Sequence, residues 1–310
     1  MGPRKCSVVI VSYNTFELTK TAIDTALQAG GGSVDVEVIV VDNDSPDGSA
    51  SRLAAAFPPR QFPSVSIVAQ ERNTGFSAAN NKGASLASGS VLFFLNPDTI
   101  VHDNAIELLY NFIESRTDVG AVGPLVLNTD GTIQASISSF VSARSIIRSN
   151  FSFLFGPPDE DVATPRSVDI VKGCALAISR EVFDKVGGWD ESIFMYSEET
   201  LLCRNVAERG HANFFLPSAV VTHIGGASTA DTYANQQVVA ARSFLDYLRR
   251  QDRRMHLVWL FRVTGAIGFA VRSVGFAVSR RLVNVERRIE HQRRGDAARR
   301  LLRWFLLEFD

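Results

Sequence analysis

The sequence has few cysteines and none of the patterns in which cysteine usually does structural work. Its 310 residues include three, Cys6, Cys174 and Cys203. An odd number without a CxxC pair argues against a disulfide framework or a thiolate zinc site. Residues 1–14 run directly into apolar alternation, without the apolar region and cleavage site of a signal peptide. We therefore expect reduced thiols and a cytoplasmic protein.

Glycine-rich phosphate-binding signatures and long apolar runs are also missing. Neither GxGxxG nor GxxxxGK[ST] occurs, which argues against a dinucleotide-dependent oxidoreductase. The best candidate for a membrane span, residues 255–279, is interrupted by Arg262 and Arg272. Because a span needs about 20 mostly apolar residues, we expect none here.

Excess charge is absent overall, but the two ends of the chain differ. The net charge of −1 excludes a generally basic nucleic-acid binder, so we expect no nucleic-acid partner. Residues 240–310 hold 16 Arg, no Lys and 7 acidic residues, whereas residues 1–239 hold 16 basic and 26 acidic residues. The C-terminal part is therefore suited to an anionic surface.

What is present points to a globular α/β protein. Hydrophobic residues make up 45% and charged residues 21% of the chain, within the globular range. Near-continuous β-branched or aromatic runs alternate with helix-length segments, which is typical of a parallel sheet covered on both faces. The predicted strands are 6–12, 36–41, 65–69 and 90–95, and the predicted helices are 16–29, 77–87 and 104–114.

The second half is less regular. Residues 130–168 are rich in Ser and contain Pro, which predicts a long connection or a mobile lid. A strand-like run over 168–179, a short helix ending at a Gly-Gly turn, an amphipathic helix over 196–210 and further strands follow. From residue 233 the pattern is helical and rich in Arg.

Acidic residues stand at predicted strand ends, where ligands bind in such sheets. Asp42 follows the second strand and Asp98 the fourth. They could accept a hydrogen bond from a base or ribose, or hold a divalent cation on phosphates. Alternatively, Asp42 and Asp44 form an Asx turn or cap the next helix. Asn73 and Gly75 precede a helix that could favour an anion, although a glycine there is more often plain turn chemistry.

Two further positions carry acid–base or metal-binding groups. Glu198 and Glu199 open a predicted helix, and His223 follows a strand. A glutamate could act as general base, and a neutral imidazole could complete a metal shell with Asp98. The alternative is that the glutamates interact with the helix dipole and that the histidine is structural.

Six segments, in this order and spacing, resemble the GT-A family 2 glycosyltransferases, most closely the rhamnosyltransferase-like branch. The resemblance covers roughly residues 6–230. The segments are SVVIVSYN (7–14), VIVVDNDSPDGS (38–49), RNTGFSAANNKG (72–83), FLNPDT (94–99), VKGCALAISREVFDKVGGWDESIFMYSEE (171–199) and THIGGAS (222–228).

The resemblance implies a GT-A, Rossmann-like, mostly parallel sheet flanked by helices, and a role for each matching residue. Glu199 matches the catalytic base, and Asp98 matches the retained acid of the metal-binding DxD motif, with His223 assisting. A Mg²⁺ or Mn²⁺ ion is therefore expected. The nucleotide and donor site is implied to include Ser12, Asn14, Asp42, Asn73, Gly75, Asn81, Asn96 and Asp98, and the acceptor side Trp189 and Asp190.

Three departures from the family pattern affect these roles. Asn96 replaces the first acid of DxD, which removes one charge from the metal shell. Glu199 stands where Asp is usual, and Leu201 stands where another acid is frequent. A non-catalytic sugar-nucleotide-binding protein is therefore kept as an alternative.

The implied activity is inverting transfer of a sugar, favouring rhamnose from its dTDP donor, to a glycan or lipid-linked acceptor in surface polysaccharide synthesis. Donors such as UDP-hexose or UDP-galactofuranose are the alternatives within the class. We expect a catalytic domain over 1–235 and an Arg-rich helical extension over 236–310. The extension either binds an anionic membrane surface at the inner face of the cell membrane, or packs on the domain or in a homodimer.

Overall fold

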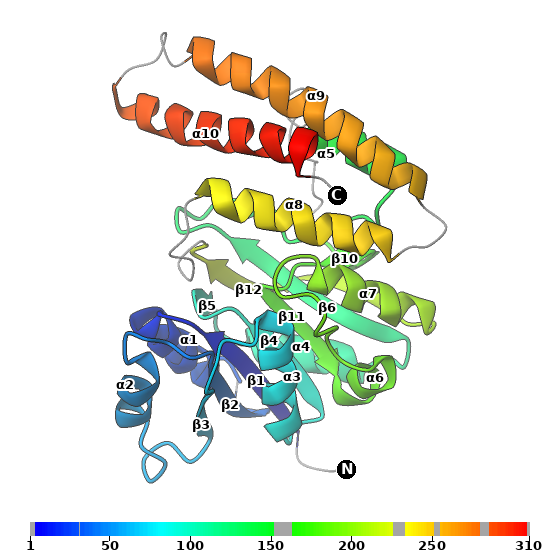
Figure 1. The fold of residues 1–310 in the computed structure, drawn as a ribbon. Helices are drawn as coiled ribbons and strands as arrows, with labels where there is room; N and C mark the ends of the chain where they lie inside the picture. The colour runs from blue at the N-terminus through cyan, green and yellow to red at the C-terminus, as the bar shows by residue number, and fades with distance from the viewer. Residues whose placement is uncertain are drawn as a thin grey trace. The chain divides into compact units, whose positions relative to one another are not determined.

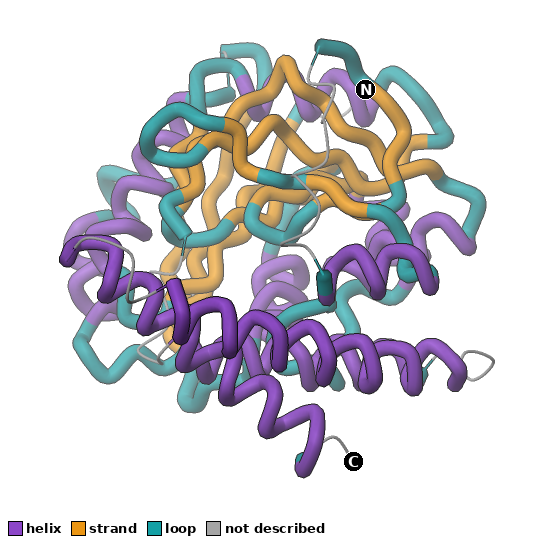
Figure 2. The backbone as a smooth tube through the Cα atoms, turned by 90° about the horizontal axis from the view of Figure 1, so that it is seen from above, coloured by secondary structure: helices purple, strands orange, loops and turns teal. Residues whose placement is uncertain are grey.

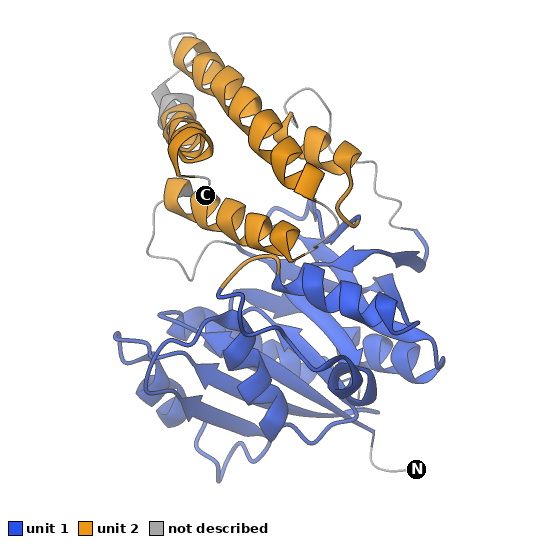
Figure 3. Cartoon of the chain, turned by 45° about the vertical axis from the view of Figure 1, so that its right-hand side comes forward, with its two compact units in different colours: residues 1–139, 161–194, 198–228 blue, residues 140–160, 195–197, 229–310 orange. Residues whose placement is uncertain are grey.

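A computed structural model describes residues 4–30, 32–151, 163–225, 233–250, 255–279 and 285–308. By internal contacts the chain divides into two units, coloured separately in Figure 3. Unit 1 comprises residues 1–139, 161–194 and 198–228, and unit 2 comprises residues 140–160, 195–197 and 229–310.

The strands all belong to unit 1 (Figure 1). They are Lys5–Ser12 (β1), Asp35–Asp42 (β2), Val65–Ala69 (β3), Val91–Leu95 (β4), Thr99–Val101 (β5), Val119–Leu127 (β6), Ile133–Gln134 (β7), Ile137–Ser138 (β8), Arg166–Val168 (β9), Ile170–Val171 (β10), Ala175–Ser179 (β11) and Ala212–His223 (β12).

The helices are shared between the two units. Those of unit 1 are Phe16–Gln28 (α1), Ser49–Ala56 (α2), Phe76–Leu86 (α3), Ala105–Glu114 (α4), Arg180–Val186 (α6) and Glu198–Glu208 (α7). Those of unit 2 are Ala143–Asn150 (α5), Tyr233–Arg249 (α8), Met255–Ser279 (α9) and Val285–Leu307 (α10).

Most strands of unit 1 belong to one sheet (Figure 2) with the order β3-β2-β1-β4-β11-β6-β12-β5, and β8 pairs with β10 in a separate two-stranded sheet. β1 pairs in parallel with β2 and β4, and β6 pairs in parallel with β12. β11 runs antiparallel between β4 and β6, and β5 runs antiparallel to β12. The four strands expected in the first hundred residues are confirmed, and the sheet is mixed rather than wholly parallel.

Alternate residues of β4 show how the two faces of the sheet are covered. Phe93 belongs to the large core that includes apolar residues of α1, α2 and α4. Phe94 points to the other face, where its ring lies 5.1 Å from the rings of Phe183 in α6 and Trp189. On this face α3 approaches β1 so closely that a Cβ at Gly83 would stand 2.3 Å from Val9 Cγ1. Only glycine allows that contact.

The region that the sequence left irregular contains short elements. Two strands, β7 and β8, and helix α5 lie between residues 130 and 150. The expected long connection or mobile lid also includes residues 152–162, which lie outside the described residues. Where the sequence predicts further strands after residue 210, the structure has one long strand, β12, which continues through a register shift between Leu216 and Val220.

In unit 2, helices α8, α9 and α10 pack together with α5 (Figure 3). Phe261 of α9 contacts Phe305 of α10, with ring centroids 5.0 Å apart. Asn150 of α5 donates a hydrogen bond from Nδ2 to Thr264 Oγ1 at 2.8 Å. The helical character expected beyond residue 233 is present, and α5 is a member of this helical unit that the sequence pattern did not indicate.

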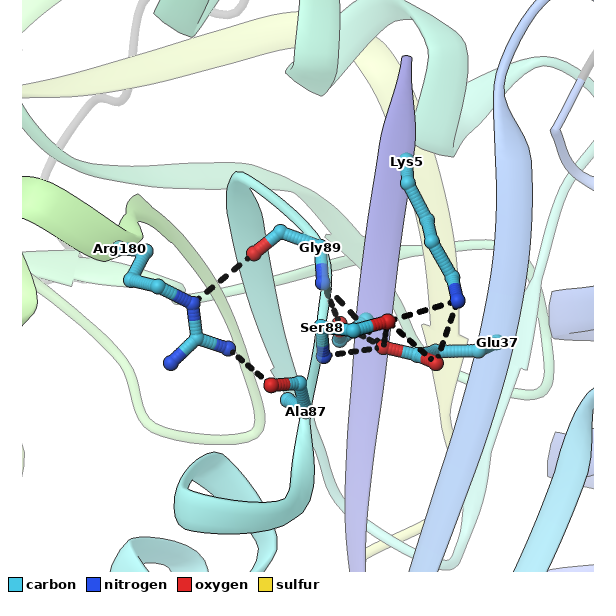
Figure 4. A network of polar contacts seen from close by, with 7 residues as sticks. Lys5, Glu37, Ala87, Ser88, Gly89 and Arg180 are labelled. Carbon is cyan, nitrogen blue, oxygen red and sulfur yellow. Dashed lines mark hydrogen bonds and ion pairs between the residues drawn. The ribbon is translucent and has the colours of Figure 1, made fainter. Parts of the chain in front are cut away.

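A polar network joins the amino-terminal ends of the parallel strands (Figure 4). Glu37 of β2 accepts hydrogen bonds from Ser7 Oγ at 2.5 Å and Ser88 N at 2.6 Å, and forms an ion pair with Lys5 at 2.7 Å. Arg180 Nε donates to Gly89 O at 3.0 Å, which attaches the start of α6 to the same turn. Burial alone would raise the pKa of Glu37, but these hydrogen bonds outweigh burial and lower it to about 2.

We predict that Glu37→Gln lowers the free energy of unfolding by about 1.5–3 kcal/mol near pH 7, since hydrogen bonds to a charged group are lost. The folded-state pKa lies below the ordinary value of 4.5. The stabilisation is therefore complete above about pH 4.5 and disappears as the pH falls toward 2. Urea unfolding of both proteins across this range measures the difference, and a difference that stays constant with pH would contradict the prediction.

Candidate functional site

The sequence-predicted residues meet at one edge of the sheet because they follow parallel strands. Ser12 and Asp42 end β1 and β2 and are register partners. Asn96 follows β4, which pairs with β1 up to Ile10 and Leu95. His223 ends β12. All lie in unit 1.

Asp42 is 1% exposed and makes the local contacts of a turn. Its Oδ1 accepts from Ser45 N at 2.9 Å and its Oδ2 from Ser45 Oγ at 2.7 Å. Ser45 Oγ also accepts from Asn14 N at 2.9 Å, which places the predicted donor residue Asn14 beside this turn. Ser12 is turned inward, with its hydroxyl 3.1 Å from Thr19 Oγ1. The Asx-turn alternative thus describes the contacts that Asp42 makes within the chain.

Asn43 connects this turn to the loop before α3, and the sequence analysis did not select it. Its Nδ2 donates to Asn73 Oδ1 at 3.0 Å, and its Oδ1 accepts from Gln70 Nε2 at 2.9 Å and Thr74 N at 3.0 Å. The side chain is 4% exposed. A buried amide with these partners fixes the loop geometry.

Gly75 ends that loop in a conformation that requires glycine. Its φ is +84°, and a Cβ would stand 2.8 Å from Phe194 Cδ2. Its N–H donates to Asn73 Oδ1 at 3.0 Å. Asn73 itself is exposed and acts in the chain as the acceptor that shapes the turn before α3. The contacts of Asn73 and Gly75 within the chain are therefore those of a turn.

Asn96, Asp98 and His223 form a compact group. His223 Nε2 lies 3.3 Å from Asp98 Oδ1 and 3.3 Å from Asn96 Nδ2. Asp98 is 3% exposed. On the other side of the ring, His223 Nδ1 lies 2.7 Å from Gln134 Oε1, and Gln134 Nε2 donates to His223 O at 3.2 Å. Gln134 is a second residue of the site that sequence reasoning missed.

This group fits a divalent cation by its donor chemistry. Gln134 Oε1 can only accept, so Nδ1 of His223 carries the hydrogen and Nε2 presents a lone pair. In this tautomer Nε2 accepts from Asn96 Nδ2, and a cation held by Nε2 and the Asp98 carboxylate would replace that hydrogen bond. Within the described part of the chain, no cluster of three or more His, Cys, Asp or Glu residues exists that could hold a metal. A Mg²⁺-type ion takes few protein ligands and completes its shell with phosphate oxygens and water, so two protein ligands suffice.

The segment 172–174 links this group to the predicted base. Asn96 N donates to Cys174 O at 2.9 Å, and Lys172 Nζ lies 3.5 Å from Glu199 Oε1. Burial raises the pKa of the Cys174 thiol to about 12, and the nearby charges of Asp98 and Glu199 contribute to the shift. One short segment thus stands beside both acids. Because β11 is antiparallel to β4, this segment enters the sheet at the ligand-binding edge.

The two glutamates at the start of α7 differ in environment. Glu198 is 7% exposed, and its Oε2 has no hydrogen-bond partner among the described residues. Burial and the adjacent Glu199 charge raise the pKa of Glu198 from 4.5 to about 8. Glu199 is less buried, and its Oε1 lies 3.5 Å from Lys172 Nζ. At neutral pH Glu198 therefore carries a proton.

The predicted acceptor-side residues and Asn81 form a separate supporting group. Asn81 Nδ2 donates to Trp189 O at 2.9 Å, and Trp189 N donates to Asn81 Oδ1 at 3.0 Å. Trp189 is 2% exposed and packs edge-on against Phe76, with centroids 5.6 Å apart. Asp190 Oδ1 accepts from Ser192 N at 2.9 Å. These contacts fix the loop after α6 against α3.

The structure therefore places Asp98 and His223 in contact and connects them through Cys174 to Glu199. It places Ser12, Asn14 and Asp42 together at the neighbouring strand ends. Asn81 and Asp190 are engaged in local contacts within their own group. Asn43 could have been found in the sequence, because it directly follows Asp42. Lys172 could also have been found, because it lies in the motif over 171–199. No sequence pattern indicated Gln134.

The sequence comparisons agree with this geometry. A sequence model of the family described as "Glycosyl transferase family 2" matches residues 7–187. The chain belongs to this family and is a glycosyltransferase. It resembles the N-acetylglucosaminyl-diphospho-decaprenol L-rhamnosyltransferase of Mycobacterium tuberculosis, with 26% identity over 247 residues that cover 72% of this chain and 76% of that protein.

Other relatives and solved structures extend the comparison. The low-salt glycan biosynthesis hexosyltransferase Agl10 of Haloferax volcanii is 28% identical over 80% of this chain and 73% of its own length. The mannosyltransferase PcManGT from Pyrobaculum calidifontis, solved with GDP-Man and Mn²⁺, has a TM-score of 0.61 at 16% identity and covers 99% of this chain and 88% of its own. GalNAc-T7, solved with UDP, GalNAc and Mn²⁺, has a TM-score of 0.57 at 18% identity, and the match covers 71% of this chain and 43% of the GalNAc-T7 chain. These structures establish the GT-A fold.

We predict that Glu198→Gln makes the folded state more stable at high pH. The raised pKa means that folded Glu198 retains a proton that the unfolded chain releases above its ordinary value of 4.5. The stability of the wild type therefore decreases between about pH 4.5 and 8 and changes no further from this group above pH 8. Glutamine keeps the neutral form, so the variant lacks this decrease.

Thermal unfolding of both proteins at several pH values between 5 and 9 measures the effect. The Tm advantage of the variant should increase with pH toward about 8, the raised pKa of Glu198. A matched control is Glu208→Gln at the exposed end of the same helix. Equal pH profiles for wild type and Glu198→Gln would show that Glu198 is ionised in the folded protein.

Proposed function

We propose that this chain transfers a sugar, with rhamnose from dTDP-rhamnose as the favoured donor, to a glycan or lipid-linked acceptor, with inversion at the anomeric carbon. The observation that carries the proposal is the link from Asp98 and His223 through residues 172–174 to Glu199. The Asp98–His223 pair is proposed to face the diphosphate, and Glu199, joined to it along one edge of the sheet, is proposed as the base. The product belongs to cell-surface polysaccharide synthesis.

The reaction proposed is a single displacement. The acceptor oxygen forms a bond to the anomeric carbon while the bond from that carbon to the diphosphate oxygen breaks. Glu199 takes the hydroxyl proton as the new bond forms, because a sugar hydroxyl is a poor nucleophile at neutral pH. Lys172 Nζ lies 3.5 Å from Glu199 Oε1 and is proposed to orient this carboxylate. The nucleoside diphosphate leaves with the electrons of the broken bond, so one displacement inverts the configuration.

Asp98 and His223 are the residues that would hold a Mg²⁺ or Mn²⁺ ion. When bound, such an ion neutralises the charge that develops on the leaving diphosphate. Gln134 keeps the His223 ring in the tautomer that leaves Nε2 available. Asn96 takes the place of the first acid and directs its amide toward the same ring, so the group holds one negative charge rather than two.

The nucleotide is proposed to lie over the ends of β1 and β2. Asp42, Asn14 and the loop around Asn73 and Gly75 surround this edge, and the Asn43 hydrogen bonds hold the loop in place. Trp189 and Asp190 are proposed to shape the acceptor side, supported by Asn81. The Asp42 carboxylate already accepts two hydrogen bonds from Ser45, and each of its oxygens retains a second lone pair for a base or ribose.

Relatives support the donor and acceptor classes. One similar protein bears the name of a rhamnosyltransferase that acts on N-acetylglucosaminyl-diphospho-decaprenol, and another that of a glycan biosynthesis hexosyltransferase. A UDP-hexose or UDP-galactofuranose donor is the alternative within the class. A non-catalytic sugar-nucleotide-binding role is the alternative outside it, motivated by Asn96 and Leu201.

A donor screen separates these alternatives. Thermal shift with dTDP-rhamnose, UDP-hexoses and UDP-galactofuranose identifies the nucleotide sugar that raises Tm, since a ligand that binds the folded state stabilises it by mass action. Release of free nucleoside diphosphate from that donor then shows turnover. Stabilisation without release, with any acceptor, would favour the non-catalytic role.

A lipid-linked acceptor requires the enzyme to work at a membrane. We therefore also propose that the chain is a peripheral protein at the cytoplasmic face of the cell membrane and that its C-terminal segment binds the anionic surface. The 16 arginines of residues 240–310 support this placement.

We predict that Glu199→Gln lowers kcat by about 10²–10⁴-fold, because glutamine cannot take the proton. Donor affinity should stay within about twofold, since the base acts on the acceptor side of the reaction. Isothermal titration measures affinity, and nucleoside diphosphate release measures turnover. Glu208→Gln, the same change at the other end of α7, should leave both unchanged. Turnover at the wild-type rate in Glu199→Gln would refute its role as the base.

We predict that Asp98→Ala abolishes detectable binding of the nucleotide-sugar donor, because the cation and the diphosphate lose their carboxylate partner. Titration with Mn²⁺ alone should also lose affinity, which gives a measurement independent of turnover. Asp103→Ala removes an exposed carboxylate after β5 and serves as the control. Unchanged Mn²⁺ and donor affinity in Asp98→Ala would contradict the assignment.

A further inference from the structure

Helix α9 carries a continuous apolar face that is exposed. Seven of its large apolar side chains are between 48% and 65% exposed. They are Met255, Trp259, Val263, Ile267, Val271, Val274 and Val278. Successive members are three or four residues apart, so they lie on one face of the helix and extend over about 35 Å. We call this set the α9 stripe.

The opposite face of α9 is packed within unit 2. Leu257, Val258 and Phe261 are buried, and Gly265 and Gly268 allow close approach. A Cβ at Gly265 would stand 2.4 Å from the Phe305 ring, and one at Gly268 would stand 2.4 Å from Asn150 O. The helix is thus held by α10 and α5 along one face while the α9 stripe stays uncovered in the chain.

The charges that interrupt the apolar sequence lie off the α9 stripe. Arg272 Nη2 donates to Ser149 O of α5 at 3.3 Å, so its guanidinium is directed to the packed side. Arg262 lies at the border, with its guanidinium 5.9 Å from the Trp259 ring centre. By length and composition α9 could cross a bilayer. The sequence had predicted no membrane span here, because Arg262 and Arg272 interrupt the apolar run. With one face packed on protein, α9 is instead suited to lie along an interface.

Basic residues bracket the α9 stripe in the sequence. Arg249, Arg250, Arg253 and Arg254 precede Met255, and Arg280 and Arg281 follow Ser279. An apolar face with arginines at both ends matches an acyl layer bounded by anionic headgroups. A second copy of the chain would supply apolar contact but would also bring these arginines together, which like-charge repulsion disfavours.

We propose that the α9 stripe inserts in the plane of a membrane and contacts the acyl chains of an anionic bilayer. This inference deepens the membrane part of the proposed function, because it names the face that binds and the class of lipid. Trp259 stands at one end of the α9 stripe with 63% of its surface exposed, whereas Trp189 and Trp304 are 2% and 1% exposed. Its fluorescence therefore reports contact with lipid.

The test uses the full chain and vesicles of phosphatidylcholine, alone or mixed with phosphatidylglycerol. We expect vesicles with phosphatidylglycerol to blue-shift the emission and protect it from acrylamide, more strongly at low salt than at high salt. Ile267→Glu should weaken binding about tenfold or more, because a carboxylate enters the apolar layer. Gln292→Glu, an exposed position of α10 with the same charge change, should remain close to wild type.

Other outcomes overturn the inference. Equal binding by Ile267→Glu and wild type would show that the α9 stripe does not contact lipid, as would an absence of binding to anionic vesicles. A wild-type dimer that Ile267→Glu converts to monomers, without vesicle binding, would assign the face to a second copy. Circular dichroism confirms folding, and Val274→Glu serves as a second variant. Donor turnover is measured on the same preparations, so loss of catalysis is distinguished from loss of membrane binding.

Discussion

The pairing of β11 with β4 is the constraint on which the site depends. Parallel strands bring Asp42, Asp98 and His223 to one edge, but they leave Glu199 on a helix far along the chain. Ala175 of β11 pairs with Leu95 of β4 in the antiparallel sense, so the residues just before β11 stand beside the residues just after β4. The Asn96 N–H to Cys174 carbonyl bond continues that ladder by one residue. Lys172, two residues further, then meets Glu199. The register of one short strand thus determines where Glu199 stands relative to the residues that follow β4.

The packing around residues 171–174 also gives the adjacent residues Glu198 and Glu199 different environments. Both open α7, where the helix dipole favours negative charge. The helix dipole acts on both glutamates alike, whereas the two side chains differ in burial. Glu198 is turned inside without a partner for Oε2, so it retains its proton, whereas Glu199 is less buried and stands beside an ammonium. A neutral Glu198 also spares Glu199 the repulsion of a like charge at close range. The difference in environment therefore comes from tertiary packing around 171–174 and not from the sequence of the pair.

The strands of the first hundred residues could be predicted because each is a buried apolar run between turn residues. The antiparallel direction of β11 could not, because its run Ala175–Ser179 has the same apolar character as a parallel strand, and direction depends on the connection. Asp42 and Asp98 could be predicted as candidate site residues from their positions at strand ends alone. The roles of Asn43 and Gln134 could not be predicted, since an amide gains its role only when folding brings partners from distant segments, such as residues 73 and 223. For α9, composition showed two arginines within an apolar run, but only the packing of α5 showed that Arg272 is directed away from the exposed face.

The charge asymmetry of the chain has a consequence for the proposed transfer to a lipid-linked acceptor. The donor is an anion, and residues 1–239, which contain the site, carry an excess of ten acidic residues over basic ones. An anionic surface repels this part and attracts residues 240–310, where basic residues exceed acidic ones by nine. Screening limits both effects to about 8 Å at physiological salt, so they act on adsorption to the surface and not on the chemistry. The nearly neutral net charge of the whole chain is therefore the sum of an acidic excess in residues 1–239 and a basic excess in residues 240–310, and any electrostatic attraction to an anionic surface has to come from the second part.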